Sequence, residues 1–449
     1  MFATPASIVS NKKTVFGFFL LFLLALLPYF IAYFPACMSP DSEAEWNQAI
    51  GIWPFDDGHP VVYTQLIRVL SYVWKSPAVL IVFNLLLFAV IYAKVFAYFR
   101  TKGMSLLLLL PVGVLFAFSP TIGRFMVTFW KDVTYTLGIC YLTYLTIVIV
   151  QNKGQALGRS FYMSLYAAAV LILIARHNGM LLVPGYALLT LYLFRKNYIK
   201  PMLLTYALAL ATFFLLKAYI HNIQDVKKSW YTLEHPMARH LGSYWVAGKL
   251  TDEEKKQLTQ IIPDSTWEGE YSKWTNDGYA FGENGLMYRE NVPKHKTLVR
   301  SLFFKKLWQD PMVFIRSELN ITQFIWAIVR SEGGYLNTYC NTCGPGKAPA
   351  LRQKLDAFTK ATEAFKPPFY SYLYLWSAAP LFWLYVITAL IFVVRKQYLY
   401  TLIFAPVALN IMSLLIASPA QDLRYIYDVI LIFPLILFFV LHYLKRKTA

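Results

Sequence analysis

Residues 14–33 read TVFGFFLLFLLALLPYFIAY, a run dominated by apolar residues that contains no charged side chain. The hydrocarbon core of a bilayer is about 30 Å thick, and roughly 20 such residues in a helix cross it. Nearly charge-free runs recur along the chain, at residues 14–33, 80–99, 106–118, 133–150, 161–174, 181–194, 203–220, 372–394, 402–417 and 427–444. The sequence therefore predicts an all-α polytopic membrane protein with about ten transmembrane helices.

The composition and the placement of charge agree with this class. Of the 449 residues, 57% are hydrophobic and 15% are charged, whereas about 25% of a soluble domain is charged. A soluble enzyme and a disordered chain are therefore excluded. The net charge of +18 would suit a polyanion partner, but cytosolic loops of membrane proteins are enriched in Lys and Arg.

With a cytosolic N-terminus, the cytosolic segments hold basic residues and no acidic ones. These basic residues are Lys12, Lys13, Lys94, Arg100, Lys102, Lys153, Arg159, Arg195, Lys196, Lys200, Arg395, Lys396, Lys445, Arg446 and Lys447. We therefore expect both termini in the cytosol, a first helix that stays as an anchor, and no nucleic-acid partner.

The ten runs divide the chain into three parts. Residues 1–220 form a seven-helix membrane module with outer loops at 35–64 and 119–132. Residues 221–368 form an α-rich extracytoplasmic domain, and residues 369–449 supply three C-terminal transmembrane helices. Within the outer domain, residues 310–330 predict an amphipathic helix along the membrane surface. Its apolar positions are Val313, Ile321, Phe324, Ile325 and Ile328.

Two cysteines of the outer domain, Cys340 and Cys343, form a C-x-x-C pattern. A loop-closing disulfide is the favoured interpretation, because disulfides persist in oxidising compartments. A zinc half-site is less favoured, since the sequence has no second cysteine pair.

Charged residues at the outer ends of the helices indicate a reaction site on that face. The acidic ones near the helices are Asp41, Glu43, Glu45, Asp56, Asp57, Asp132, Asp422 and Asp428, and the cationic ones are Arg124, Lys131, Arg176, His177 and Arg424. Snorkelling explains any single cation. Five of them beside acidic groups better fit recognition of a phosphate carried by a membrane lipid, a task suited to the arginine fork.

The first outer loop permits both a structural and a functional interpretation. Ser39 can cap a helix that begins at Pro40, and Asp41 then favours the helix dipole. Alternatively, Asp41 is a general base, kept ionised near a helix N-terminus. Farther along, Asp56, Asp57 and His59 can hold substrate hydroxyls or, less favourably, a divalent cation such as Mg or Mn. The metal ligands would then be Asp41, Asp57 and His59.

Several short motifs resemble the GT-C superfamily of integral-membrane glycosyltransferases, and most closely a largely uncharacterised bacterial branch of it. They are Pro40-Asp41-Ser42, Trp46-Asn47-Gln48-Ala49, Asp57-Gly58-His59-Pro60-Val61-Val62-Tyr63-Thr64, Trp130-Lys131-Asp132-Val133, Arg176-His177-Asn178-Gly179 and Arg424-Tyr425. The resemblance covers the seven-helix module and the last helix, whereas residues 225–368 match nothing in that family.

The resemblance implies transfer of a sugar from a polyprenyl phosphate or diphosphate donor to a glycan, lipid or protein acceptor. It places the reaction on the outer face, and the protein in the bacterial inner membrane. By motif, Asp41 is the catalytic carboxylate, Lys131 and Asp132 line the second-loop part of the site, and Arg424 holds the donor phosphate. Asp56, Asp57 and His59 depart from the double-acidic metal motif of oligosaccharyltransferases. From the motifs together with the residue types, we expect Asp56, Asp57, His59 and Asp132 to bind the acceptor, and Lys131, Arg124, Arg176, Arg424 and Tyr425 to bind the donor phosphate. Two alternatives remain open: a flippase or transporter of a lipid-linked glycan, and a surface-polysaccharide polymerase or ligase.

Overall fold

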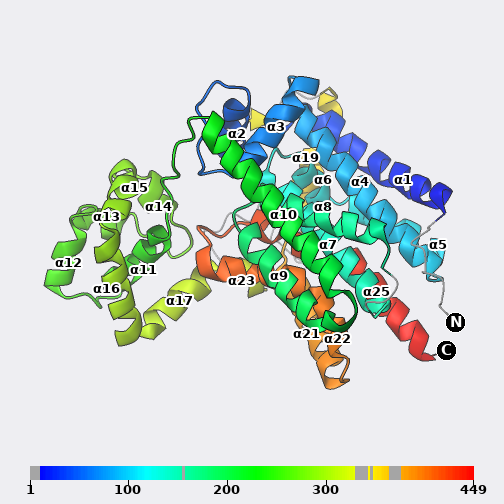
Figure 1. Cartoon of the computed structure of the whole chain (residues 1–449). Coiled ribbons are helices and arrows are strands. Elements are labelled where there is room, and N and C mark those ends of the chain that lie inside the picture. The colour runs from blue at the N-terminus through cyan, green and yellow to red at the C-terminus, as the bar shows by residue number, and fades with distance from the viewer. Residues whose placement is uncertain (1–10, 154–156, 329–341, 344–346, 364–375, 449) are drawn as a thin grey trace.

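The computed structural model describes residues 11–153, 157–328, 342–343, 347–363 and 376–448 (Figure 1). It is 78% helical with almost no strands, as an all-α polytopic protein requires. The bundle helices are α1 (Lys12–Tyr33), α3 (Val61–Val73), α4 (Ala78–Thr101), α5 (Leu106–Ala117), α6 (Pro120–Met126), α7 (Lys131–Gln151), α8 (Arg159–Ala175), α9 (Gly179–Leu193), α10 (Arg195–Ile223), α21 (Ala379–Val394), α22 (Tyr398–Thr401), η1 (Leu402–Phe404), α23 (Ala405–Ala417), η2 (Leu423–Ile426), α24 (Tyr427–Leu431) and α25 (Phe433–Thr448).

Within the described residues, six helices are long and apolar enough to cross a membrane, or up to seven if a bent pair counts as one span. The all-α membrane class is therefore confirmed, and the count of ten spans stays a prediction. Three of the predicted spans coincide with the shorter apolar helices α8, α9 and α21. A fourth, at 106–118, coincides with α5, whereas α6 lies in the segment predicted as the outer loop 119–132; the two helices meet at 58°. The bend follows from Ser119-Pro120, because Ser119 caps α6 and Pro120 occupies its first position.

Helix α7 is the centre of the bundle (Figure 1) and packs against α4, α8, α23 and α24. Residues 132–150 are all buried. Its threonines fit this interior because their hydroxyls bond to carbonyls of the same helix, as Thr143 does to Ile139 and Thr146 to Leu142. The N-terminal end of α7 carries Lys131 and Asp132, so the most deeply buried helix of the bundle presents two charged side chains at one end.

The first two outer loops are bonded to each other. Strand β1 (Cys37–Met38) makes two backbone hydrogen bonds with the second loop, both through Cys37. The Cys37 amide donates to the Val127 carbonyl and the Phe129 amide donates to the Cys37 carbonyl, each at 2.9 Å. The strand also pairs antiparallel with β2 (Thr342–Cys343).

Directly after β1, Ser39 caps α2 (Pro40–Ala49), as the sequence predicted. The Trp130 indole donates to the Ser39 hydroxyl over 2.8 Å. The start of α2 is therefore fixed beside the start of α7.

The outer domain has a core of its own. It contains α11 (Glu234–Val246), α12 (Asp252–Leu258), α13 (Asp264–Gly269), α14 (Asp277–Phe281), α15 (Gly285–Lys294), α16 (Lys296–Gln309) and α17 (Pro311–Ile321). Trp267, Tyr288 and Leu241 are completely buried in it. The two following helices pack instead on the bundle: α18 (Gln323–Trp326) contacts α21, and α19 (Pro349–Glu363) contacts α1 and α6.

The predicted helix at 310–330 is divided in two. Helix α17 ends at Ile321 and α18 starts at Gln323. Ile321, Phe324 and Ile325 are buried, as their apolar character indicated, but the exposed face of α17 is also apolar. The Cys340–Cys343 disulfide falls partly outside the described residues, because Cys340 is not among them. The backbone of Cys343 lies opposite Cys37 in the two-stranded sheet.

We predict that Gly179→Ala destabilises the α8–α9 turn, which carries Arg176. A β-carbon at Gly179 would lie 2.3 Å from the carbonyl oxygen of Ile172, a backbone atom that cannot rotate away. Overpacking of this kind costs about 1–3 kcal/mol, and a lower unfolding temperature in detergent would report it. Gly158→Ala, at the opposite end of α8, meets no atom within 4 Å. An equal effect of both substitutions would contradict the predicted clash.

Candidate functional site

The candidate site is organised by contacts of Arg424, which lies in η2 before the last long helix. Its Nη1 atom is 2.8 Å from Oδ2 of Asp41, in the first turn of α2. Its Nε atom is 2.8 Å from Oδ2 of Asp422. These contacts bring the first outer loop to the last one, across 383 residues of chain. Asp422 is itself fixed, because its Oδ1 accepts the Arg424 amide at 3.0 Å and caps η2.

Two aromatic rings hold the Arg424 guanidinium on its other sides. The guanidinium carbon is 5.2 Å from the centre of the Trp130 ring and 5.1 Å from that of Tyr425. Nη2 also donates to the Tyr425 hydroxyl at 3.3 Å. Cation–π contacts of this type stabilise a partly desolvated guanidinium. Arg424 is therefore held in one position by carboxylates and rings together.

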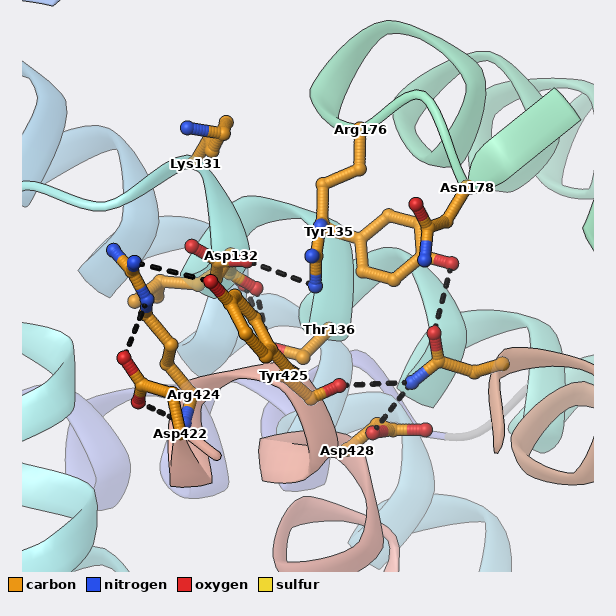
Figure 2. A network of polar contacts seen from close by, with 12 residues as sticks. Lys131, Asp132, Tyr135, Thr136, Arg176, Asn178, Asp422, Arg424, Tyr425 and Asp428 are labelled. Carbon is orange, nitrogen blue, oxygen red and sulfur yellow. Dashed lines mark hydrogen bonds and ion pairs between the residues drawn. The ribbon is translucent and has the colours of Figure 1, made fainter. Parts of the chain in front are cut away.

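A second arginine lies on the opposite side of Tyr425 (Figure 2). Arg176, from the α8–α9 turn, has its guanidinium carbon 4.7 Å from the Tyr425 ring centre. Its Nη1 atom is 3.0 Å from Oδ1 of Asp132, and both side chains are buried. Asp132 lies in the first turn of α7, where the helix dipole favours a negative charge. Two arginine–carboxylate pairs thus flank one tyrosine.

The charges at this site oppose the ordinary effect of burial on Asp41. Burial raises the pKa of its carboxyl, but the positive charges of Arg424 and Lys131 outweigh burial and hold that pKa well below its usual range. Asp422 behaves in the opposite way. Burial, with Asp132 and Asp41 nearby, raises the pKa of Asp422 to about 7 although Arg424 lowers it. Of the two carboxyls that contact Arg424, Asp41 therefore has the lower pKa.

The partners of Lys131 differ from those of Arg424 and Arg176, and in Figure 2 its side chain points away from the two arginines. Its Nζ atom is 2.7 Å from Oε1 of Glu45 and 2.9 Å from Nδ1 of His59. Glu45 is one turn after Asp41 on α2 and is almost completely buried. Burial raises the pKa of Glu45, but Lys131 and His59 together outweigh burial and lower it. Lys131, Glu45 and His59 therefore form a second charged cluster. It lies next to the Arg424 cluster, because the charge of Lys131 also lowers the pKa of Asp41.

The acidic residues of the predicted Asp56-Asp57-x-His59 group separate in the structure. Asp57 Oδ2 is 2.8 Å from Lys217 Nζ and 3.7 Å from His221 Nε2, both on α10. Asp56 accepts the Gly58 amide and so shapes the local turn. The main chain of this loop is bonded to the start of the outer domain, since Lys227 donates to the Phe55 carbonyl at 2.8 Å.

The alternative of a divalent cation on Asp41, Asp57 and His59 does not fit this geometry. The three side chains turn to Arg424, Lys217 and Lys131, respectively. Within the described part of the chain, no cluster of three or more His, Cys, Asp or Glu side chains could hold a metal ion.

A buried polar network lies beneath the arginines, as Figure 2 shows. Asn410 of α23 donates to Oδ1 of Asp428 at 3.0 Å and to the Tyr425 carbonyl at 3.1 Å. It accepts from the Tyr135 hydroxyl at 3.1 Å. Asp428 and Asn410 are completely buried. The network joins α7, α23 and α24, and it therefore fixes the segment that carries Tyr425 and Arg424.

Arg124 has a different set of partners from the other predicted phosphate ligands. Its Nη1 atom is 3.3 Å from Oδ1 of Asp356 on α19, and its guanidinium stacks on the Tyr33 ring. The Tyr33 hydroxyl donates to the same carboxylate oxygen over 2.6 Å. These contacts attach α19 to α1 and α6, which is a structural task.

Sequence reasoning gave no specific site role to Asp422, Glu45, Lys217 and Trp130, although it counted Asp422 and Glu45 among the acidic residues near the helix ends. Asp422 had a local signal, because an aspartate two residues before an arginine can cap that short helix. Glu45 had another, since it is four residues after Asp41 and so faces the same side of α2. Lys217 and Trp130 meet their partners only through tertiary packing.

Comparisons with protein-family models, with curated proteins and with solved structures find no match to this chain. The resemblance of its short motifs to the GT-C superfamily thus stays a prediction, and the function is argued from the site.

We predict strong energetic coupling between Asp132 and Arg176. Either Asp132→Asn or Arg176→Gln leaves one buried charge without its partner, which typically costs about 3–5 kcal/mol. In the double variant neither charge remains, so its loss of stability should be smaller than the sum by about 1–3 kcal/mol. Denaturant unfolding in a mild detergent measures the cycle.

The exposed pair Lys294–Glu290, 3.3 Å apart, is the matched control. Its coupling should stay below about 0.5 kcal/mol. A coupling between Asp132 and Arg176 as small as that of the control would contradict the assignment.

Proposed function

We propose that this protein is a membrane glycosyltransferase that moves a sugar from a polyprenyl-(di)phosphate donor to a glycan, lipid or protein acceptor at the outer membrane face. The observation that carries the proposal is the contact between Asp41 and Arg424. A carboxylate suited to proton removal and a guanidinium suited to phosphate binding meet there, at the ends of membrane helices.

The two arginines support the phosphate part of the proposal. Arg424 and Arg176 lie on the two faces of Tyr425, and each presents a planar fork that matches phosphate oxygens. Without substrate, both forks are neutralised by carboxylates. A phosphate that binds Arg424 therefore competes with Asp41 for the same guanidinium.

This competition gives the site an order of events. While Asp41 is paired with Arg424, its depressed pKa makes it a poor proton acceptor. When the donor phosphate binds the Arg424 guanidinium, the ion pair that stabilises the Asp41 carboxylate is weakened, and the pKa of Asp41 rises. Donor binding thereby activates the base, and proton removal follows it.

The transfer step balances within these groups. The acceptor hydroxyl oxygen attacks the anomeric carbon of the donor sugar and forms the new glycosidic bond, while its proton passes to Asp41. The bond from the anomeric carbon to the phosphate oxygen breaks, and its electron pair leaves with the phosphate. Arg424 and Arg176 stabilise the negative charge that develops there. We propose that Asp57 and His59, in the same loop as Asp41, bind acceptor hydroxyls once these replace part of their contacts with Lys217 and Lys131.

Asp41→Asn tests this role. The variant keeps the shape of the side chain but cannot accept the proton, so sugar transfer should fall by about 100-fold or more. The measurement is release of polyprenyl phosphate from a panel of polyprenyl-phosphate sugars by the purified protein. Glu43→Gln, on the opposite side of α2, is the control and should transfer at the wild-type rate.

Unchanged transfer by Asp41→Asn would contradict the proposed base. If wild type releases no polyprenyl phosphate but moves labelled lipid-linked glycan between leaflets of a vesicle, the protein is a flippase, and the proposal of sugar transfer fails.

A further inference from the structure

The exposed side of the outer domain carries an apolar stripe where α16 meets α17. The exposed fractions of its members are large: Phe304 48%, Trp308 87%, Met312 51%, Ile315 41% and Leu319 47%. A helix on the surface of a water-soluble domain normally shows polar residues on its outer face. A run of large exposed apolar side chains usually marks an interaction surface.

The spacing places the stripe residues of each helix on one face of that helix. Met312, Ile315 and Leu319 recur at intervals of three and four residues, so they share one face of α17. The opposite face of α17 holds Ser317 and Ile321, which are buried against the rest of the protein. Phe304 and Trp308 are one turn apart near the end of α16, just before the chain enters α17. The stripe is therefore not part of the domain's own core.

The stripe leads directly to the apolar surface of the membrane bundle. Helix α17 is followed by α18, which packs on α21, and the Trp383 indole of α21 donates to the Trp326 carbonyl at 2.7 Å. Helix α21 exposes apolar residues along its length, among them Ile387 and Leu390. In Figure 1, α17 runs from the outer domain toward the bundle. The exposed apolar residues of α17 thus continue toward those of α21.

The charges around the stripe complement a membrane surface. Residues 296–321 carry five basic side chains and two acidic ones. Arg300 pairs with Glu234, and Lys305 and Lys306 pair with Glu254. Arg316 is exposed beside the apolar residues of α17. Tryptophan prefers the boundary between headgroups and hydrocarbon. Basic groups that flank an apolar helix face attract anionic lipid headgroups.

We propose that the α16–α17 stripe docks the outer domain on the lipid bilayer that the bundle spans, with its apolar side chains among the acyl chains next to the headgroups. Docking would hold the domain close to the membrane surface. That domain also bonds to the loop before Arg424: the Asn276 amide donates to the Pro419 carbonyl at 2.9 Å, and the Gln421 amide to the Trp274 carbonyl at 3.0 Å. The bilayer would then help to fix the arginine loop.

Spin labels test the docking in the full-length protein. A nitroxide is attached to Ile315→Cys, and to Leu286→Cys as the matched control, in nanodiscs of phosphatidylcholine and phosphatidylglycerol. Leu286 is 64% exposed and lies on α15, outside the stripe. The signal of the parent protein, treated identically, is subtracted to remove labels on native cysteines.

For each label we take the ratio of its accessibility to oxygen to its accessibility to a water-soluble nickel complex. We expect this ratio to be at least threefold higher at position 315 than at position 286. Equal access of the nickel complex at both positions would overturn the proposal, because the stripe would then face water. A label at 315 that neither reagent reaches would also overturn it, since the stripe would then be covered by protein.

Discussion

Two arginines are largely buried at one end of the helix bundle, Arg176 and Arg424, and a buried guanidinium needs a partner that compensates its loss of water. Arg424 has Asp41 and Asp422, and Arg176 has Asp132. These carboxylates come from the first outer loop, the last outer loop and α7. Satisfying the arginines therefore forces segments that are distant in sequence to meet at one place. The bonds of Cys37 to the second loop and of Trp130 to Ser39 hold those segments in register.

The outer domain is attached to both of the loops that carry charged site residues. Its main chain is bonded to the loop at Phe55 and Asp57, and to residues 419 and 421 just before Asp422. Both loops that carry charged site residues thus have a second attachment outside the bundle. A movement of the outer domain would act on Asp57 and Arg424 together.

The sequence predicted the parts of this structure that have a local cause. Charge-free runs predicted the helices, Ser39-Pro40 predicted the start of α2, and acidic residues at helix ends predicted the charged cluster there, whereas the side of the membrane that it faces stays a prediction. The sequence could not predict which charged side chains pair, because the partners meet only after the helices have packed. Arg124 and Arg424 look alike in sequence, yet Arg124 meets Asp356 whereas Arg424 meets Asp41. Asp57 and His59 are two residues apart, yet they turn to different lysines.

The central claim is that Asp41 and a lipid phosphate compete for Arg424. Native mass spectrometry of the purified protein, titrated with a polyprenyl phosphate, measures this most directly for wild type, Asp41→Asn, Arg424→Gln and the exposed control Lys294→Gln, which lies on α15 outside the site and the apolar stripe. We expect tighter binding to Asp41→Asn than to wild type, binding at least tenfold weaker to Arg424→Gln, and no change in Lys294→Gln. Equal affinity of all four proteins for the lipid would contradict it.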